Sequence, residues 1–260
     1  MIRQVLLTGD GPVAWVTLSN PGKLNAMSRA MWRGLRDVFA GLQRRTDIRC
    51  VLLRGEGANF CAGGDIAEYP DFRFDEASLR DFHETDVWGG LQAILDCDIP
   101  VIAHIEGACM GAGMEIASCC DLRLAGASAR FGAPIAKLGF PMAPREAALV
   151  MRAAGELTAR EMLLSAAVLD APTMLQRGFL NRVLADGDVA AEALATARRV
   201  AGLAPQAARL NKQCFRALAQ VLPAQAAIDL IATAGAYGYA DSAEHREGVA
   251  AFIEKRVLQF

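Results

Sequence analysis

Short apolar runs alternate with longer segments of helical periodicity through the first half of the chain, and this alternation constrains the fold more than any other feature. The runs that we predict to be strands are Cys50–Leu53, Val101–Ile105 and Asp121–Ala125. The first two are largely apolar along their whole length, which is typical of strands covered on both faces. Such strands separated by helices predict an α/β core.

Turn and cap residues mark further elements in this half of the chain. Gly9–Pro12 separates the strand-like runs Val5–Thr8 and Val13–Leu18, which predicts a hairpin. Ser28 is an expected helix N-cap, because residues of helical periodicity follow it. A further helix is expected over Asp75–Leu95.

The second half of the chain favours helices from Ala143 onward. We place a boundary near Leu203-Ala204-Pro205, which divides a core of residues 1–203 from a C-terminal helical region of residues 204–260. The C-terminal region is small and apolar, so we expect it to dock on the core or on another subunit.

Composition and charge exclude several classes of function. Hydrophobic residues make up 53% and charged residues 22% of the chain, which is typical of a well-packed globular protein. The net charge of -2 provides no bulk attraction to nucleic acid or to an anionic membrane. We find no signal-peptide pattern and no apolar run of the roughly 18 residues that a membrane span needs. Seven irregularly spaced cysteines fit reduced thiols, so we expect a cytoplasmic protein without a metal site.

Two glycine-rich segments contain the residues suited to chemistry. In Asn59–Ile66, small residues let backbone N–H groups approach a ligand, although a tight turn would have the same composition. In Gly107–Glu115, a strand ends, glycines turn the chain and a helix begins near Ala112. The first N–H groups of a helix lack intrahelical acceptors and carry partial positive charge, which suits a developing oxyanion.

Glu115 follows Ala112 by about one helical turn, and it is the only acidic residue between Glu106 and Asp121. Apolar neighbours should raise its pKa into the range that suits proton transfer near neutral pH. A first-turn acid that only complements the helix dipole is the alternative.

A dinucleotide-binding turn is the rival interpretation of the same segment. Gly111-Ala112-Gly113 followed by Ile116 matches only two of the three glycines of that motif. Arg130 stands where the motif places an acidic residue, so an oxidoreductase of this kind is disfavoured.

Taken together, these segments resemble the crotonase (enoyl-CoA hydratase/isomerase) family over nearly the whole chain. The matching motifs are Asn20–Met27, Phe60–Ile66, Gly107–Asp121, Phe131–Pro134 with Leu138-Gly139, and Asp241–Arg256. The resemblance implies a crotonase-like (ClpP/crotonase) spiral of ββα units. It also implies a C-terminal α-helical region that forms trimers, often paired as hexamers.

The resemblance further implies an acyl-CoA site without a separate cofactor, since coenzyme A is part of the substrate. The backbone N–H groups of Gly64 and Ala112 match the family's oxyanion hole, and Glu115 matches the first of two catalytic glutamates. Positions that match coenzyme A binding are Lys23, Leu24, Ala62, Asp65, Ile66 and, from a neighbouring subunit, Lys255. A solvated helix face would explain Lys255 equally well.

Ile135 occupies the position of the family's second catalytic glutamate, and isoleucine cannot transfer a proton. We therefore expect a 2-enoyl-CoA hydratase in which Glu115 is the sole acid and base. Double-bond isomerisation, decarboxylation or carbon–carbon cleavage, and non-catalytic acyl-CoA binding are the alternatives. Side chains that could replace the missing acid, although a solvated or structural role is the simpler expectation for each, are Glu68, Tyr69, His83, Glu84, Asp86 and Arg145.

Overall fold

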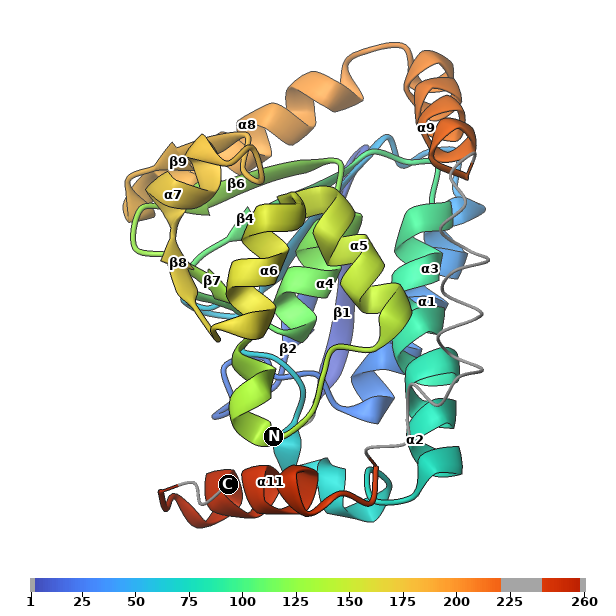
Figure 1. Ribbon diagram of the computed structural model, residues 1–260. Coiled ribbons are helices and arrows are strands. Elements are labelled where there is room, and N and C mark those ends of the chain that lie inside the picture. The colour runs from blue at the N-terminus through green and yellow to red at the C-terminus, as the bar shows by residue number, and fades with distance from the viewer. Residues whose placement is uncertain (1–2, 221–239, 258–260) are drawn as a thin grey trace.

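Two β-sheets organise the protein in the computed structural model, which describes residues 3–220 and 240–257 (Figure 1). The main sheet has the strand order β1-β2-β3-β4-β6-β9, and all its neighbours are parallel except the antiparallel pair β1 and β2. The second sheet has the order β5-β7-β8. The strands are β1 (Gln4–Asp10), β2 (Val13–Ser19), β3 (Cys50–Gly55), β4 (Val101–Ile105), β5 (Ala108–Met110), β6 (Leu122–Gly126), β7 (Arg130–Gly132), β8 (Val168–Asp170) and β9 (Arg182–Leu184).

Helices cover both faces of the main sheet. The α-helices are α1 (Arg29–Gln43), α2 (Glu76–Asp81), α3 (Trp88–Asp96), α4 (Ala112–Cys119), α5 (Pro144–Ala154), α6 (Glu156–Leu164), α7 (Ala171–Gln176), α8 (Val189–Ala201), α9 (Pro205–Gln220) and α11 (Ala243–Glu254). Short 3₁₀ turns span Ile66–Asp71, Pro134–Leu138 and Asp186–Asp188, and a π-helical stretch, Phe82–Val87, joins α2 to α3. No helix within the described ranges is long and apolar enough to cross a membrane.

The central strands β3 and β4 are apolar on both sides because their side chains alternate between two cores. Leu52 of β3 packs with Ala193 and Ala197 of α8 on one face of the sheet. Its neighbours Val51 and Leu53 point to the other face, where they join the larger core that α1, α3 and α4 complete. The predicted α/β class with strands covered on both faces is confirmed.

The local predictions agree with the structure except at the shortest elements. The hairpin and the Ser28 cap are present, and the Met31 N–H donates to Ser28 Oγ at 3.2 Å. The Gly107–Gly113 segment, expected as a loop, contains the strand β5, and β8 and β9 interrupt the region expected to be helical alone. Three-residue strands are too short to display a period of two, so only their pairing partners define them.

The C-terminal helices contact the core at two separate ends of the molecule (Figure 1). In α9, Arg216 Nη2 lies 2.6 Å from Asp98 Oδ1, beside the end of α3. In α11, Gly248 lies against the backbone of Leu138, where a β-carbon would come within 2.1 Å of the Leu138 carbonyl carbon. Through that close approach α11 reaches the 3₁₀ turns that border the candidate site described next.

Candidate active site

The two glycine-rich segments lie side by side. The Cys61 N–H donates to the Ala108 carbonyl, and the Met110 N–H donates to the Cys61 carbonyl, each at 2.8 Å. A β-carbon on Gly111, whose φ is +46°, would lie 3.6 Å from the Cα of Gly63. The residues that follow, Gly64 and Ala112, therefore stand on neighbouring backbone segments.

The neighbouring backbone bonds indicate how the N–H groups of these two residues are oriented. The segment around Gly64 is tied to Met27 through the Gly63 carbonyl and the Asp65 N–H, each at 2.8 Å. In a ladder of this kind the intervening residue points its own N–H to the opposite side. Ala112 is the first residue of α4, where an N–H has no intrahelical acceptor. That these two N–H groups form an oxyanion hole stays a prediction.

Glu115 projects from α4 beside these segments, and every other residue of that helix is buried. Glu115 as a whole is half-buried. Desolvation raises the pKa of Glu115 to about 8, the neighbouring Glu146 raises it as well, and Arg73 lowers it. At neutral pH the Glu115 side chain is therefore predominantly the neutral acid, which can donate a proton.

Glu146 brings a second carboxyl to the site that the sequence analysis missed. It stands in the first turn of α5, which packs against α4, and only 1% of its surface is exposed. Its Oε1 lies 2.9 Å from Nδ1 of His83, a residue of the π-helical stretch. The sequence shows a first-turn acid of an amphipathic helix, which is normally a solvated residue that complements the helix dipole. Only the packing of α5 on α4 reveals the burial.

Arg73 is the second site residue that was missed. Its guanidinium carbon lies 4.2 Å from the ring centroid of Tyr69 and 4.1 Å from that of Phe140, and the residue is 1% exposed. In the part of the chain that the structure describes, its Nε and Nη2 have no hydrogen-bond partner. The sequence Phe72-Arg73-Phe74 lies in a polar stretch and carries no pattern that would predict a buried cation.

Four of the residues matched to coenzyme A binding form one connected group. Lys23 Nζ lies 2.7 and 2.9 Å from the two carboxylate oxygens of Asp65, and the Ala62 N–H donates to the Leu24 carbonyl at 3.0 Å. Leu24 is exposed and has a φ of +47°. Ala62 and Asp65 flank Gly64, and Lys23 and Leu24 lie in the segment that follows β2, so these contacts join two segments that are distant in sequence. That the group binds coenzyme A stays a prediction.

Ile66 and Lys255 complete the set of matched positions. Ile66 is half-buried and begins the 3₁₀ turn that follows Asp65. Lys255 is exposed at the C-terminal end of α11, in a left-handed conformation. Its contribution to a neighbouring subunit's site stays a prediction.

The proposed substitutes for the missing acid fall into two groups. Tyr69 and His83 belong to the site, whereas Asp86 accepts bonds from Nε of Arg29 at 2.6 Å and Nε of Arg33 at 2.7 Å. The remaining candidates form surface ion pairs: Glu68 with Arg3, and Glu84 with Arg145.

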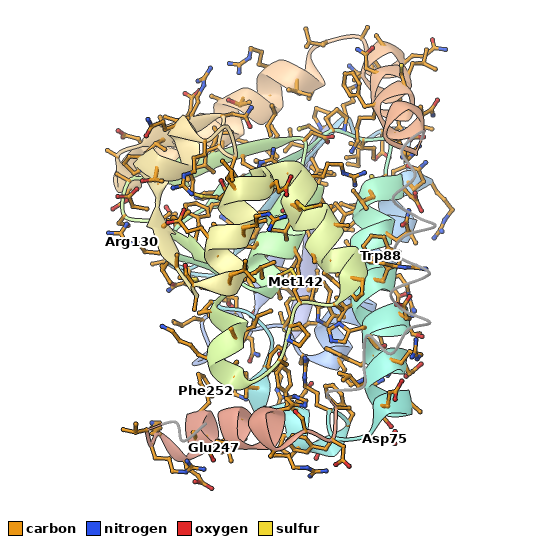
Figure 2. The ribbon with its side chains drawn as sticks, in the orientation of Figure 1. Asp75, Trp88, Arg130, Met142, Glu247 and Phe252 are labelled. Atoms are coloured by element: carbon orange, nitrogen blue, oxygen red, sulfur yellow. The ribbon has the colours of Figure 1, made fainter. Side chains whose placement is uncertain are left out.

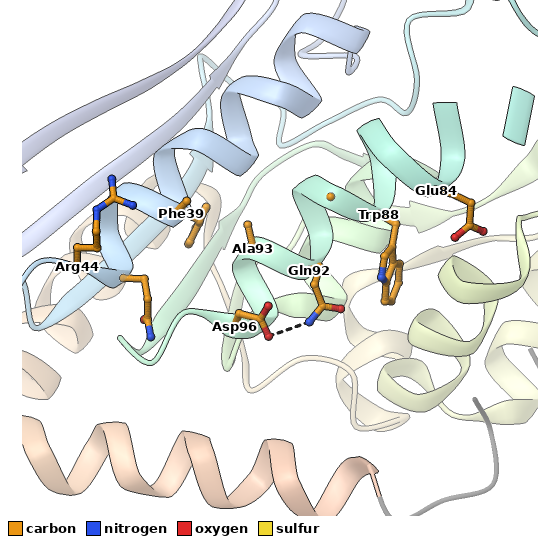
Figure 3. A pocket seen from close by; sticks show the side chains of 10 residues that line it. Phe39, Arg44, Glu84, Trp88, Gln92, Ala93 and Asp96 are labelled. Carbon is orange, nitrogen blue, oxygen red and sulfur yellow. Dashed lines mark hydrogen bonds between the residues drawn. The ribbon is translucent and has the colours of Figure 1, made fainter. Parts of the chain in front are cut away.

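A groove of about 470 Å³ lies elsewhere, between α1 and α3 (Figure 3). Phe39 and Trp88 are among its lining residues, and Glu115, Glu146 and Arg73 are not. Trp88 stands on α3 (Figure 2). The centroid of its ring lies 5.5 Å from the guanidinium carbon of Arg145. The groove is therefore separate from the carboxyl pair.

Comparisons with known proteins identify the family. A family model described as enoyl-CoA hydratase/isomerase matches residues 8–260. A probable enoyl-CoA hydratase of Mycobacterium bovis is 32% identical over 257 residues, which cover 98% of this chain and 97% of that protein. The structure of an enoyl-CoA hydratase/carnithine racemase from Magnetospirillum magneticum is 36% identical, with a TM-score of 0.81 and coverage of 98% and 94%. The structure of a methylmalonyl-CoA decarboxylase has a TM-score of 0.87 at 26% identity, with coverage of 98% and 97%.

Proposed function

The chain belongs to the enoyl-CoA hydratase/isomerase family, and from this premise we propose that it is a lyase that adds water reversibly to a 2-enoyl-CoA. The crotonase-like fold expected from the sequence is confirmed by the same relatives. The observation that supports hydration is the pair of carboxyls, Glu115 and Glu146, on two packed helices beside Gly64 and Ala112.

The N–H groups of Gly64 and Ala112 supply the first requirement of the reaction. When a nucleophile attacks C3 of a 2-enoyl thioester, negative charge develops on the thioester oxygen. Two backbone donors held in place before the reaction stabilise that charge, and the loss of one such donor typically costs about 10²–10³ in rate.

The carboxyl pair supplies the proton transfers. Burial raises the pKa of Glu115 to about 8, so this carboxyl carries a proton near neutral pH. Glu115 holds this proton, and Glu146, positioned by His83, is the base. Glu146 takes a proton from water as the water oxygen bonds to C3, and Glu115 gives its proton to C2. The product is a 3-hydroxyacyl-CoA, and the next water returns the proton from Glu146 to Glu115.

Decarboxylation of a 2-carboxyacyl-CoA is the second candidate, because the decarboxylase has the higher TM-score of the two solved structures described above. There the carboxylate leaves C2 as carbon dioxide, the same donors hold the enolate, and Glu115 protonates C2. That reaction needs one proton donor and no base. It leaves the buried Glu146–His83 pair without a role, so hydration accounts for more of the site.

Product analysis in ¹⁸O-labelled water tests the proposal. We expect crotonyl-CoA to gain one labelled water, and Glu115→Gln and Glu146→Gln each to lower kcat/KM by about 10²–10⁴. Glu156→Gln, on the exposed face of α6, is the matched control and should leave the rate unchanged. Hydration that survives in both site variants would remove the carboxyl pair from the mechanism. Loss of carbon dioxide from a 2-carboxyacyl-CoA, without hydration of any enoyl-CoA, would favour the second candidate.

A further inference from the structure

Arg73 combines two properties that are costly together in a folded protein. It is 1% exposed, and its Nε and Nη2 lack hydrogen-bond partners among the residues of known placement. A buried cation with unsatisfied donors is strongly unfavourable unless an anion or an acceptor compensates it. The carboxyl of Glu146 is already bound by His83, and no described carboxylate lies within 4.0 Å of the Arg73 guanidinium. The compensating group is therefore missing from the described part of the chain.

The surroundings of Arg73 specify the shape of that group. Tyr69 and Phe140 lie within about 4.2 Å of the guanidinium carbon and stabilise the cation through their ring faces. Such contacts use the flat faces of the guanidinium and leave the in-plane N–H groups unused. Nε and Nη2 lie on the same edge and present two parallel donors, which match the two oxygens of a carboxylate.

The location of Arg73 connects this edge to the reacting centre. The ring of Tyr69 that lies against the guanidinium carries a hydroxyl that borders Gly64. On the other side, the positive charge of Arg73 is close enough to Glu115 to lower its pKa. A group held by Arg73 therefore lies within the length of a short acyl chain from the oxyanion hole and the carboxyl pair.

We propose that the substrate's acyl chain carries a second carboxylate and that Arg73 binds it through Nε and Nη2. This inference rests on the proposed function and specifies its substrate class: a 2-enoyl thioester of a short dicarboxylic acid, with one carboxyl joined to coenzyme A and the other free. Arg73 is then a specificity-determining residue. It holds the far end of the acyl chain while Glu115 and Glu146 act on C2 and C3.

Two substrates of equal chain length test the proposal in the unmodified protein. Glutaconyl-CoA and 2-pentenoyl-CoA both have five acyl carbons, and only the first has a free carboxylate. A charge-assisted hydrogen bond of this kind typically raises affinity by about 10–100-fold. We therefore expect kcat/KM for glutaconyl-CoA to exceed that for 2-pentenoyl-CoA by at least about 10-fold. Equal values for the two substrates would overturn the proposal.

Substitution of Arg73 separates recognition from structure. Arg73→Met should reduce the ratio of kcat/KM for glutaconyl-CoA to kcat/KM for 2-pentenoyl-CoA to about one, and Arg73→Lys should restore part of that ratio. Arg160→Met, an exposed arginine of α6, is the matched control. If Arg73→Met lowers kcat/KM equally for the two substrates, Arg73 supports only the fold or Glu115, and the inference fails.

A binding measurement distinguishes this failure from failure of the proposed function. Glutaryl-CoA and pentanoyl-CoA are saturated and cannot be hydrated, so calorimetry with them is independent of catalysis. Tighter binding of glutaryl-CoA to the unmodified protein, lost in Arg73→Met, supports the inference even if no enoyl-CoA is hydrated. Equal affinities for the two thioesters overturn it even if crotonyl-CoA is hydrated.

Discussion

The hydroxyl oxygen of Tyr69 lies 2.1 Å from the position that a β-carbon on Gly64 would occupy, and the ring carbon that bears it lies at 3.1 Å. The φ of Gly64 is not positive, so the backbone would tolerate another residue there. Contact with Tyr69 is therefore what requires glycine next to the predicted oxyanion hole.

This contact predicts the effect of Gly64→Ala. Because the added methyl overlaps the Tyr69 hydroxyl, we expect a loss of stability of about 1–3 kcal/mol, with reduced activity. Tyr69→Phe removes the overlapping oxygen and should recover part of the loss in the double variant, which thermal unfolding can measure. Gly41→Ala, on α1 with no atom near its added methyl, is the control and should not destabilise. Strictly additive effects of the two site substitutions would contradict the explanation.

The pH dependence of catalysis follows from the raised pKa of Glu115. If its acid form donates the proton to C2, kcat/KM for 2-pentenoyl-CoA should decline as the pH rises through about 8. Glu146→Gln removes a like charge and should move this decline to lower pH in the residual activity. Arg73→Met removes a cation and should move it to higher pH. A decline that stays in place in both variants would mean that another group limits the rate.

The same pKa shift predicts a pH dependence of stability. The folded pKa of Glu115 lies above its ordinary value of 4.5, so between about pH 4.5 and 8 the folded state binds more protons than the unfolded state. The favourable contribution of the protonated form is complete below this window and is lost as the pH rises through it. Glu115→Gln should remove that part of the slope and be the more stable protein at pH 9.

Chemical denaturation at several pH values, with the two proteins compared, measures this difference. His245 is also buried, and burial lowers its pKa to about 4, which makes stability rise with pH between about 4 and 6.5. That contribution is present in both proteins and cancels in the comparison. Parallel stability curves for the two proteins would show that Glu115 ionises normally.

Asp86 provides a test of stability without catalysis. Its buried carboxylate joins the π-helical stretch to Arg29 and Arg33 of α1. Asp86→Asn keeps the shape and removes the charge, so we expect a loss of about 1–3 kcal/mol in the free energy of unfolding with kcat/KM unchanged. Asp47→Asn, which breaks an exposed pair with Arg45, is the control and should leave the unfolding curve unchanged. A fall in kcat/KM of Asp86→Asn, measured where the variant is fully folded, would show that Asp86 takes part in the reaction.

Local signals in the sequence predicted most of the scaffold and one of the three charged residues Glu115, Glu146 and Arg73. Gly107–Glu115 combines a turn, a helix start and an acid within nine residues, so Glu115 was identifiable from neighbours in the chain. Glu146 and Arg73 differ from surface residues only in what packs over them. Glu146 contacts His83 and Arg73 contacts Phe140, and both partners are distant in sequence.

The π-helical stretch escaped prediction for a related reason. Its extra residue per turn depends on tertiary contacts, and the segment Asp75–Leu95 has the periodicity of an ordinary helix. The trimer or hexamer and the role of Lys255 remain predictions, since each concerns contacts between subunits. The boundary near Leu203-Ala204-Pro205 also remains a prediction.

The carboxyl pair and Arg73 belong to parts of the chain that obey different constraints. Glu115 and Glu146 stand on α4 and α5, whose packing is inseparable from the sheet, so any relocation would disturb the whole interior. Arg73 stands in the irregular chain between a 3₁₀ turn and α2, outside both sheets. If Arg73 selects the acyl chain as proposed, substitutions confined to the four residues 72–75 would alter which thioesters the protein accepts and leave the two carboxyl-bearing helices unchanged.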